Sequence, residues 1–219
     1  MIKHKSLAEF VIKELEGKIV KGTLKPGERI IEEDLCKAYG ISRAPVREAL
    51  RILESQGLIK RQPRKGVMVT PITSKEAEDI YRIRANLESL AIYLAVKNRD
   101  PRILKKLKKI HSRMKELAAA GKVSTAYFNL NLQFHKTLVD ASGNQRLIQM
   151  IETFVTQTKR YRMEVLSMPG RIKSSLENHE EIIRSFEEGD AEKAEQLRKS
   201  TILRNIKAFS EKFKKEGAE

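Results

Sequence analysis

Two arginines one helical turn apart are the first residues in this sequence whose spacing suggests a binding function. The stretch SRAPVREALRILESQGLI, residues 42–59, places Arg43 and Arg47 four residues apart. On an α-helix they project together from one side. Another side is apolar and carries Val46, Ala49, Leu50 and Leu53. Guanidinium groups bind phosphates and the O6 and N7 atoms of guanine, so this spacing predicts a helix with one buried side and one DNA-binding side.

A second group of residues suggests a metal site or a polar pocket. His135 and His179 each lie on the apolar face of an expected helix, and Asn131 precedes His135 by one turn. One inward histidine is typical of a satisfied core residue. Two from different helices, with an amide close by, could instead meet as ligands of a divalent ion of the zinc or nickel type. Both interpretations stay open at this point.

Composition and charge restrict the class of protein. The 219 residues, of which 40% are hydrophobic, are enough for one large or two small domains. The net charge of +15 favours a polyanionic partner, although solvated helix faces also contribute to it. No apolar run approaches the ~20 residues of a membrane span, and the N-terminus lacks the core of a signal peptide. We therefore expect no membrane partner and a cytoplasmic location, which agrees with the single cysteine, Cys36.

The elements that precede and contain the two arginines suggest a helix-turn-helix. Apolar side chains recur at helical spacing over residues 6–21, and a short helix with an acidic start is expected at 32–39. Gly40 ends that helix, and only Ile41 and Ser42 separate it from the arginine-bearing helix. We also expect Ser42 to cap the N-terminus of that helix. Two short helices around a glycine-centred turn are typical of this DNA-binding motif.

A basic hairpin is expected directly after the arginine-bearing helix. The segments LIKR and VMVT have strand-like composition and flank QPRKG, a connection with Pro63 and Gly66. They predict a two-stranded wing. Its cations Arg61, Arg64 and Lys65 would lie near the sugar-phosphate backbone or the minor groove of a duplex.

The remainder of the chain carries only helical patterns. We expect helices over about 75–98, 102–120, 123–141, 144–166, 171–188 and 190–214. Long helices on short loops predict an antiparallel bundle. The expected fold is therefore mainly α, with a winged helix-turn-helix over residues 1–71 and an all-helical domain of about six helices over residues 72–219.

The segment GTLKPGERIIEEDLCKAYGISRAPVREALRILESQGLIKRQPRKGVMV resembles the winged helix-turn-helix of the GntR family of bacterial transcription regulators. In that family the operator is contacted by the residues aligned with Ser42, Arg43, Ala44 and Arg47, and by the tip of the wing near Gly66. Position 44 is often threonine in the family. The resemblance therefore implies DNA binding with one hydroxyl contact fewer, and it does not fix the operator sequence.

The C-terminal half resembles the all-helical effector domain of the FadR subgroup, called FCD, through RANLE, NLQFH followed by SGN, and HEEIIRSFEEGD. In metal-binding members, an Asp or Asn and three histidines hold a divalent ion beneath a small carboxylate effector. Asn131, His135 and His179 align with three of these ligands, whereas Thr201 stands at the fourth position. An amide and a hydroxyl are poor ligands, so the affinity for metal should be much reduced.

The same resemblance implies an alternative without metal. The polar pocket, Thr201 included, would then bind an organic effector directly. Arg84, and Arg160 or Arg162 with it, would receive a carboxylate through bidentate hydrogen bonds. Surface or intrahelical salt bridges are the competing role for these arginines.

Together these features predict a ligand-responsive transcription regulator that binds palindromic operator DNA as a homodimer. Most members of the family are repressors, so we expect repression. A non-specific DNA-binding protein would also account for the charge. A metal-dependent enzyme would account for the two histidines, but the sequence holds no HExxH motif, nucleophile elbow or phosphate-cradling glycine loop. We therefore expect no enzymatic activity.

Overall fold

The computed structural model describes residues 4–71, 73–120 and 125–216. Within its helices, the side chains of residues 4–6, 74, 160, 163, 164 and 207–216 lie outside the description. The chain forms two compact units, Met1–Thr73 and Ser74–Glu219, and each has an apolar core of its own. The described parts are mainly helical, as the sequence predicts, and none of their helices is long and apolar enough to cross a membrane.

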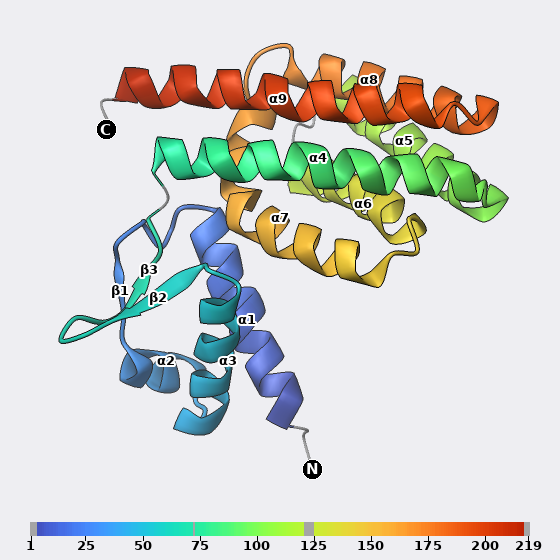
Figure 1. The fold of residues 1–219 in the computed structure, drawn as a ribbon. Helices are drawn as coiled ribbons and strands as arrows, with labels where there is room; N and C mark the ends of the chain where they lie inside the picture. The colour runs from blue at the N-terminus through green and yellow to red at the C-terminus, as the bar shows by residue number, and fades with distance from the viewer. Residues whose placement is uncertain (1–3, 72, 121–124, 217–219) are drawn as a thin grey trace. The chain divides into compact units, whose positions relative to one another are not determined.

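The first unit packs its helices around the apolar side of the arginine-bearing helix (Figure 1). Its helices are α1 (His4–Val20), α2 (Glu32–Tyr39) and α3 (Arg43–Ser55). Gly40 ends α2 in the left-handed region, at φ 63°, and its backbone N–H donates to the carbonyl of Cys36. On α3, Val46, Ala49, Leu50 and Leu53 are all 0% exposed and pack with α1 and the strands. The predicted apolar side of α3 is confirmed.

The wing has three strands, not the two that the sequence predicts. β1 (Arg29–Ile30) and β2 (Ile59–Gln62) both pair antiparallel with β3 (Gly66–Val69), in the order β1-β3-β2. A strand of two residues shows no periodicity, which is why β1 cannot be recognised in the sequence. Gln62 pairs with Gly66, so the loop at the tip has three residues rather than five. Arg64 turns this loop with φ at 64°.

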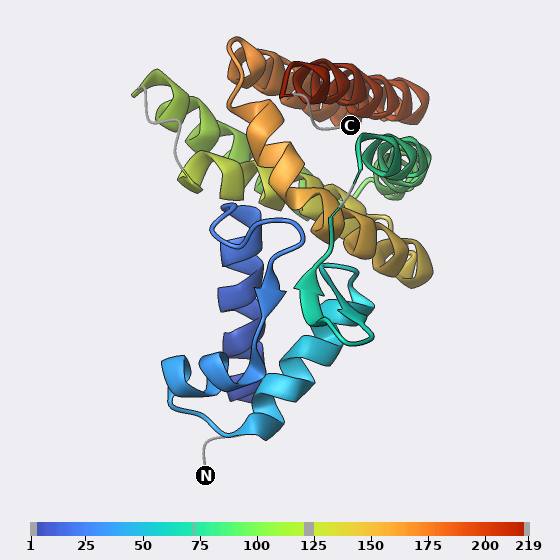
Figure 2. The same ribbon diagram turned by 90° about the vertical axis from the view of Figure 1, so that its left-hand side faces the viewer.

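The second unit is a bundle of long helices, as predicted (Figures 1 and 2). Its described helices are α4 (Ser74–Asn98), α5 (Pro101–Ala119), α6 (Thr125–Ala141), α7 (Gln145–Leu166), α8 (Arg171–Glu188) and α9 (Ala191–Glu216). Each predicted span agrees with these bounds to within two residues. Local chemistry fixes the ends: Asp100 caps α5 by accepting from the N–H of Arg102, and Gly189 ends α8 at φ 74°.

Packing within this bundle leaves a polar region among its helices. The helices α4 and α9 run side by side in both ribbon views. One apolar core joins α4, α5, α6, α8 and α9 around residues such as Ile92, Leu107 and Phe134. A second cluster, around Val139 and Ile151, joins α4, α6 and α7. The polar side chains of the region come from the same helices, so the packed apolar layers hold them in place.

Candidate DNA-binding surface and effector pocket

The start of α3 presents the side chains that the sequence assigns to DNA. Arg43 and Ala44 are exposed in the first turn, and the Arg47 side chain is 57% exposed one turn later. Ser42 occupies the N-cap position and is exposed, but it makes no side-chain cap hydrogen bond, contrary to our expectation. The buried apolar side fixes the rotation of α3. Arg43 and Arg47 therefore face solvent.

The carboxylate of Glu32 interacts both with Arg47 on α3 and with Arg61 in the wing. Glu32, in the first turn of α2, accepts a hydrogen bond from Arg47 Nε at 2.9 Å, and its other oxygen lies 3.7 Å from Arg61 Nη1. The hydrogen bond to Glu32, followed by its charge, raises the pKa of Arg47. Arg61 also lies 3.8 Å from Glu54, which accepts from the Arg61 backbone N–H. Both guanidinium groups are therefore oriented by carboxylates before any DNA is bound.

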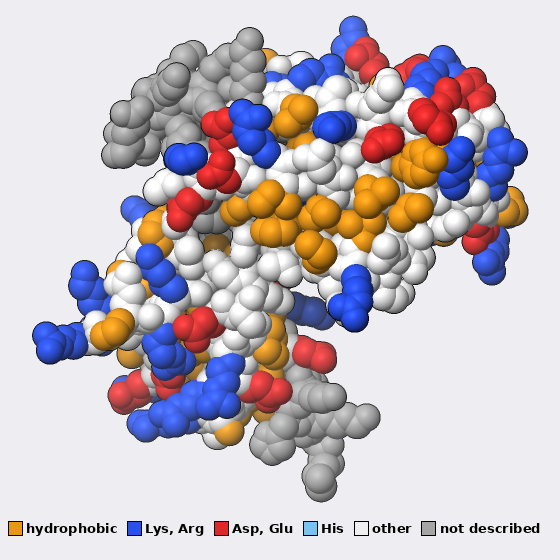
Figure 3. All heavy atoms as spheres, in the orientation of Figure 1, with side chains coloured by type: hydrophobic (Ala, Val, Ile, Leu, Met, Phe, Trp, Pro, Cys, Tyr) orange, Lys and Arg blue, Asp and Glu red, His pale blue; other side chains and the backbone are white. Residues whose placement is uncertain are grey.

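The tip of the wing carries the remaining predicted contacts. Arg64 and Lys65 are exposed, and Gly66 begins β3 at φ 82°, a value that favours glycine. Figure 3 shows Lys and Arg side chains gathered over the wing and over the region of α2 and α3, with acidic side chains among them. The surface of the first unit thus combines an exposed helix N-terminus with a basic hairpin tip.

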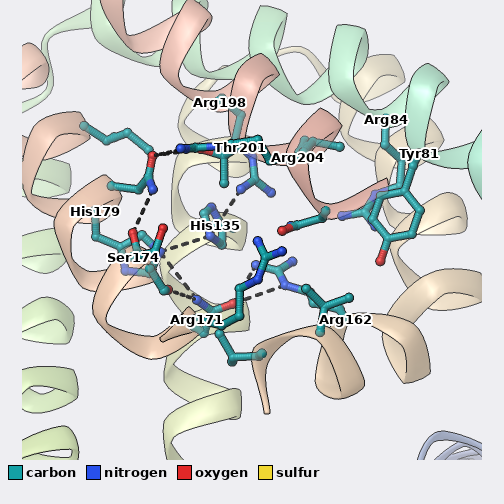
Figure 4. Close-up of a pocket in the computed structure, with 18 residues that line it drawn as sticks. Tyr81, Arg84, His135, Arg162, Arg171, Ser174, His179, Arg198, Thr201 and Arg204 are labelled. Carbon is teal, nitrogen blue, oxygen red and sulfur yellow. Dashed lines mark hydrogen bonds between the residues drawn. The ribbon is translucent and has the colours of Figure 1, made fainter. Parts of the chain in front are cut away.

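A pocket in the second unit is lined mainly by polar side chains from α4, α6, α7, α8 and α9 (Figure 4). It encloses about 710 Å³ of space, open solvent included. Its arginines are Arg84, Arg162, Arg171, Arg198 and Arg204. No Asp or Glu belongs to the described residues that line it. The pocket is therefore strongly positive.

Glu88 anchors two of these arginines in the interior. Its carboxylate accepts from Arg84 Nε at 2.8 Å and from Arg198, whose Nε lies at 3.1 Å and whose Nη2 also donates. The exposed fraction is 1% for Glu88, 2% for Arg84 and 3% for Arg198. Burial alone would raise the pKa of Glu88, but Arg198 and Arg84 lower it to about 2. Glu88 is thus an anion at neutral pH. Arg84 further donates to Thr158 Oγ1 at 2.6 Å.

The two predicted histidines meet at the inner end of the pocket. His135 Nε2 lies 3.1 Å from His179 Nε2 and 3.3 Å from Arg198 Nη1. Since a guanidinium only donates, His135 Nε2 accepts from Arg198. His179 Nε2 also lies 3.4 Å from Asn131 Nδ2, so it faces an amide donor as well as His135. Burial, and then the charge of Arg198 among others, holds the pKa of His135 well below 6.5. Burial, followed by His111 and Arg198, does the same for the pKa of His179, so both rings are neutral at pH 7.

Asn131 is bound by a further arginine. Its Oδ1 accepts from Arg162 Nε at 3.1 Å and Nη2 at 2.8 Å, and its Nδ2 donates to Ser175 Oγ at 3.0 Å. Among the described side chains, no carboxylate forms a salt bridge with Arg162. Burial, with the charges of Arg198 and Arg84, lowers the pKa of Arg162 far below the ordinary value of a guanidinium, to about 9. Figure 4 shows Arg162 and Arg198 pointing toward His135 from different helices.

Comparison with known proteins agrees with this architecture. Residues 7–69 match the model of the bacterial regulatory proteins of the gntR family, and residues 79–203 match the FCD domain. The chain is 36% identical over 183 residues to the HTH-type transcriptional regulator YdhC of Bacillus subtilis, covering 84% of this chain and 82% of that protein. The chain belongs to the GntR family and carries an FCD domain.

Other relatives of this GntR protein have more specific names. The gluconate operon transcriptional repressor of Bacillus subtilis is 32% identical over 186 residues, covering 81% of this chain and 74% of that protein. Among solved structures, E. coli McbR/YncC has a TM-score of 0.80 at 25% identity and covers 97% of this chain and 100% of its own. All three of these relatives are named as transcriptional regulators or repressors. The protein is therefore a bacterial GntR-family transcriptional regulator with an FCD effector domain.

The remaining effector residues predicted in this FCD domain have different surroundings. Arg84 lies in the wall of the pocket, with its charge engaged by Glu88. The hydroxyl of Thr201 lines the pocket and lies 2.8 Å from Asn178 Oδ1 and 2.7 Å from the Leu197 carbonyl, which are alternative acceptors for its one hydrogen. Arg160 lies on α7, and its side chain is outside the described residues.

Sequence reasoning missed two polar residues of the FCD domain. Arg198 touches both Glu88 and His135, but no sequence motif points to it. His111 stands among polar residues in the sequence, yet it is 6% exposed, and its ring lies edge-on to His179 at a centroid distance of 6.1 Å. Both residues share a helix face with apolar neighbours. A charged or polar residue within an apolar stripe was the available signal.

The side chains at the predicted metal site of this GntR protein fit a divalent ion poorly. The two imidazole Nε2 atoms do converge, but Arg198 donates to one of them and Arg162 occupies the amide oxygen of Asn131. Thr201 directs its hydroxyl hydrogen elsewhere. Among the described residues, no group of three or more His, Cys, Asp or Glu is arranged to hold a metal. A metal would meet two guanidinium groups, and none of the described side chains around it offers an anionic ligand.

Proposed function

We propose that this regulator represses transcription by binding a palindromic operator as a homodimer, and that a small carboxylate-type effector in the FCD pocket changes its affinity for DNA. Effector binding would favour one arrangement of the dimer and thereby alter the spacing of its two recognition helices. Repression is supported by relatives such as the gluconate operon repressor of Bacillus subtilis.

The exposed N-terminus of α3 supports the DNA-binding part of the proposal. In helix-turn-helix proteins, the first residues of the second helix enter the major groove and contact base edges. Arg43 and Arg47 occupy that position here and face solvent, while Arg64 and Lys65 project from the wing tip. We assign base contacts to the α3 arginines and phosphate contacts to the wing.

An apolar stripe on α4 supports the homodimer. Ile83 and Leu90 are 44% and 42% exposed, and the partly buried Leu87 and Leu94 lie on the same face of the helix. Figure 3 shows hydrophobic side chains in a band along α4. A continuous apolar band on a helix is typical of a protein–protein contact, and a second copy offers the same band to it. A two-fold dimer would in turn favour an operator with inverted repeats.

The positive pocket carries the effector part of the proposal. Arg84 and Arg198 share the interior carboxylate of Glu88, whereas Arg162 is held by the neutral amide of Asn131. An anionic ligand would reduce the electrostatic repulsion that remains among these three guanidinium groups. Guanidinium groups also bind carboxylates through two parallel hydrogen bonds.

The DNA-binding part is tested by selecting bound duplexes from random DNA with the full-length protein. The selected sequence is then titrated with the wild type and with Arg43→Ala and Arg47→Ala. We expect an inverted repeat, a preference of about 10³ or more over random DNA, and a loss of roughly tenfold to hundredfold in each variant. Lys105→Ala, exposed on α5, is the control. Selection of no common sequence would favour a non-specific DNA-binding protein instead.

A further inference from the structure

We propose that the FCD pocket binds a small dianion directly through Arg162 and Arg198, and that Arg198 makes a divalent metal unnecessary. This inference rests on the proposed function, in which the pocket receives an anionic effector. It goes further by naming the inner binding groups, the charge of the ligand and its independence from metal.

The charge balance of the pocket favours an anion over a cation. Of the interior groups, Glu88 is the one described carboxylate, and it is shared between Arg84 and Arg198. Arg162 is held by the neutral amide of Asn131. Positive charge therefore exceeds negative charge at the inner end before any ligand arrives. A divalent cation would increase this excess, whereas an anion would reduce it.

The two inner arginines are fixed in place without a ligand. Glu88 holds Arg198 through Nε and Nη2, which leaves Nη1 directed at His135, 3.3 Å away. Asn131 holds Arg162 through Nε and Nη2 in the same manner. Because these side chains are already ordered, a ligand that binds them loses little additional side-chain entropy. This pre-organisation is the feature that a metal ion would otherwise supply.

The histidines are committed to hydrogen bonds that a metal would have to break. His135 Nε2 accepts from Arg198 and lies 3.1 Å from His179 Nε2, which in turn lies 3.4 Å from Asn131 Nδ2. Metal ligation would require a free lone pair on both Nε2 atoms, and so loss of the Arg198 contact to His135 and of the Asn131 contact to His179. The single hydroxyl hydrogen of Thr201 has Asn178 and the Leu197 carbonyl as its acceptors, and no further ligand among the described residues completes the set.

A second anionic group is expected because arginines also occur farther along the pocket wall. Arg171 at the start of α8 and Arg204 on α9 both line the pocket and are more exposed than Arg198. Arg204 donates to Asn178 Oδ1 at 3.2 Å, a neutral partner. One anionic end of the ligand would bind Arg162 and Arg198, and the other would bind Arg171 and Arg204. A ligand with a single charge would satisfy only one of these pairs.

The test measures ligand binding by the full-length protein after passage over a chelating resin. Soluble chelators are avoided because they are polycarboxylates and would compete for the pocket. Calorimetric titrations use succinate, butyrate and inorganic phosphate, followed by ZnCl₂ and NiCl₂ with and without these anions. Succinate and butyrate share a four-carbon chain and differ in their second carboxylate, so the pair isolates the effect of the second charge.

We expect succinate or phosphate to bind the metal-free protein at least about tenfold more tightly than butyrate. Arg162→Gln should weaken this binding about tenfold to hundredfold, as expected for hydrogen bonds between charged groups. Arg146→Gln, an exposed arginine on the same helix, is the matched control and should bind as the wild type does. Arg198→Lys tests the second inner cation with its charge kept, in case removal of the charge beside Glu88 prevents folding.

The outcomes separate this inference from the proposed function. Dianion binding that appears only after zinc or nickel is added would overturn the metal-free site and leave an effector pocket intact. Equal affinities for succinate and butyrate would overturn the inference that the pocket prefers a dianion. If none of the three anions binds with or without metal, both the inference and the anionic effector fail, while operator binding by the first unit stands untouched.

Discussion

Replacing the partly buried Arg162 with glutamine should stabilise the ligand-free protein. Arg162 is a cation without a described carboxylate partner, close enough to Arg198 and Arg84 for their charges to disfavour its protonated form. Glutamine removes the charge and keeps an amide N–H that can still donate to Asn131 Oδ1. The variant that weakens effector binding is therefore expected to melt at a higher temperature, a trade between stability and function that binding sites commonly show.

The size of the effect follows from the pKa of Arg162. The fall of this pKa from the ordinary value of a guanidinium to about 9 corresponds to about 5 kcal/mol of destabilisation when the group stays protonated at neutral pH. Weaker hydrogen bonding to Asn131 offsets about 1–3 kcal/mol of the gain. The net gain of about 2–4 kcal/mol should raise the melting temperature by about 4–16 °C for a cooperative unit of this size.

The pH dependence of stability tests independently whether the charge on Arg162 destabilises the folded protein. Arg162 is charged in both the folded and the unfolded chain below pH 9, so the full penalty is present there. Above about pH 9 the folded wild type releases this proton while the unfolded chain keeps it, and wild-type stability rises relative to the variant. The difference in melting temperature should therefore narrow between pH 7.5 and pH 10.

The assay is thermal unfolding followed by circular dichroism in Tris and ethanolamine buffers, which supply no polyvalent anion to the pocket. Arg162→Lys keeps a cation at the site, so its melting temperature should rise much less than that of Arg162→Gln. Arg146→Gln controls for the loss of an arginine from α7. An Arg162→Gln variant that melts at or below the wild-type temperature would show that the guanidinium is not under electrostatic stress, and the charge argument for the anion would lose its basis.

Three further outcomes are expected. Glu32→Gln should raise the affinity for random duplex DNA, measured by fluorescence anisotropy, by about threefold to tenfold, because it removes a negative charge beside Arg47 and Arg61. An unchanged affinity would show that Glu32 does not lie at the DNA-binding surface. The free energy of unfolding in urea should fall as pH drops below 6.5, since His135 and His179 have lowered pKa values and must become charged, and His179→Gln should flatten this fall. Leu90→Asp should give a monomer in analytical ultracentrifugation, while Lys105→Asp should not.

The helices of this protein could be predicted from sequence because each has a clear apolar period and a chemical stop. Gly40 and Gly189 end helices in the left-handed region, and Asp100 with Pro101 starts one, so the bounds agree closely. The strand β1 could not be found in this way. Its two residues acquire their conformation from pairing with Met68 and Val67, which is a tertiary contact and leaves no local pattern.

The pocket was only partly predictable because its ionic contacts join residues far apart in the chain. His135 and His179 stood out by type, but Arg198 lies 110 residues from Glu88, and nothing local identifies that pair. The surrounding stripe did hold a signal, since Ala194, Arg198 and Ile202 share the buried face of α9. A charged residue in such a stripe needs a buried partner, although the sequence does not say which.

The two units use the same pairing of one carboxylate with two arginines, and burial decides what each pairing does. Glu32 and Arg47 are 23% and 57% exposed, so water and salt screen their attraction, and DNA phosphates can take over Arg47 when they arrive. The side chains of Glu88 and Arg198 are only 1% and 4% exposed. Separating these two would leave a buried charge without a partner, so the pair persists when a ligand binds. Arg47 is thus an arginine that exchanges partners, and Arg198 is one that keeps its partner and offers its remaining N–H groups. The contrast explains why neutralising Glu32 should strengthen binding of a polyanion, whereas neutralising Glu88 should release Arg198 from its fixed position and weaken binding in the pocket.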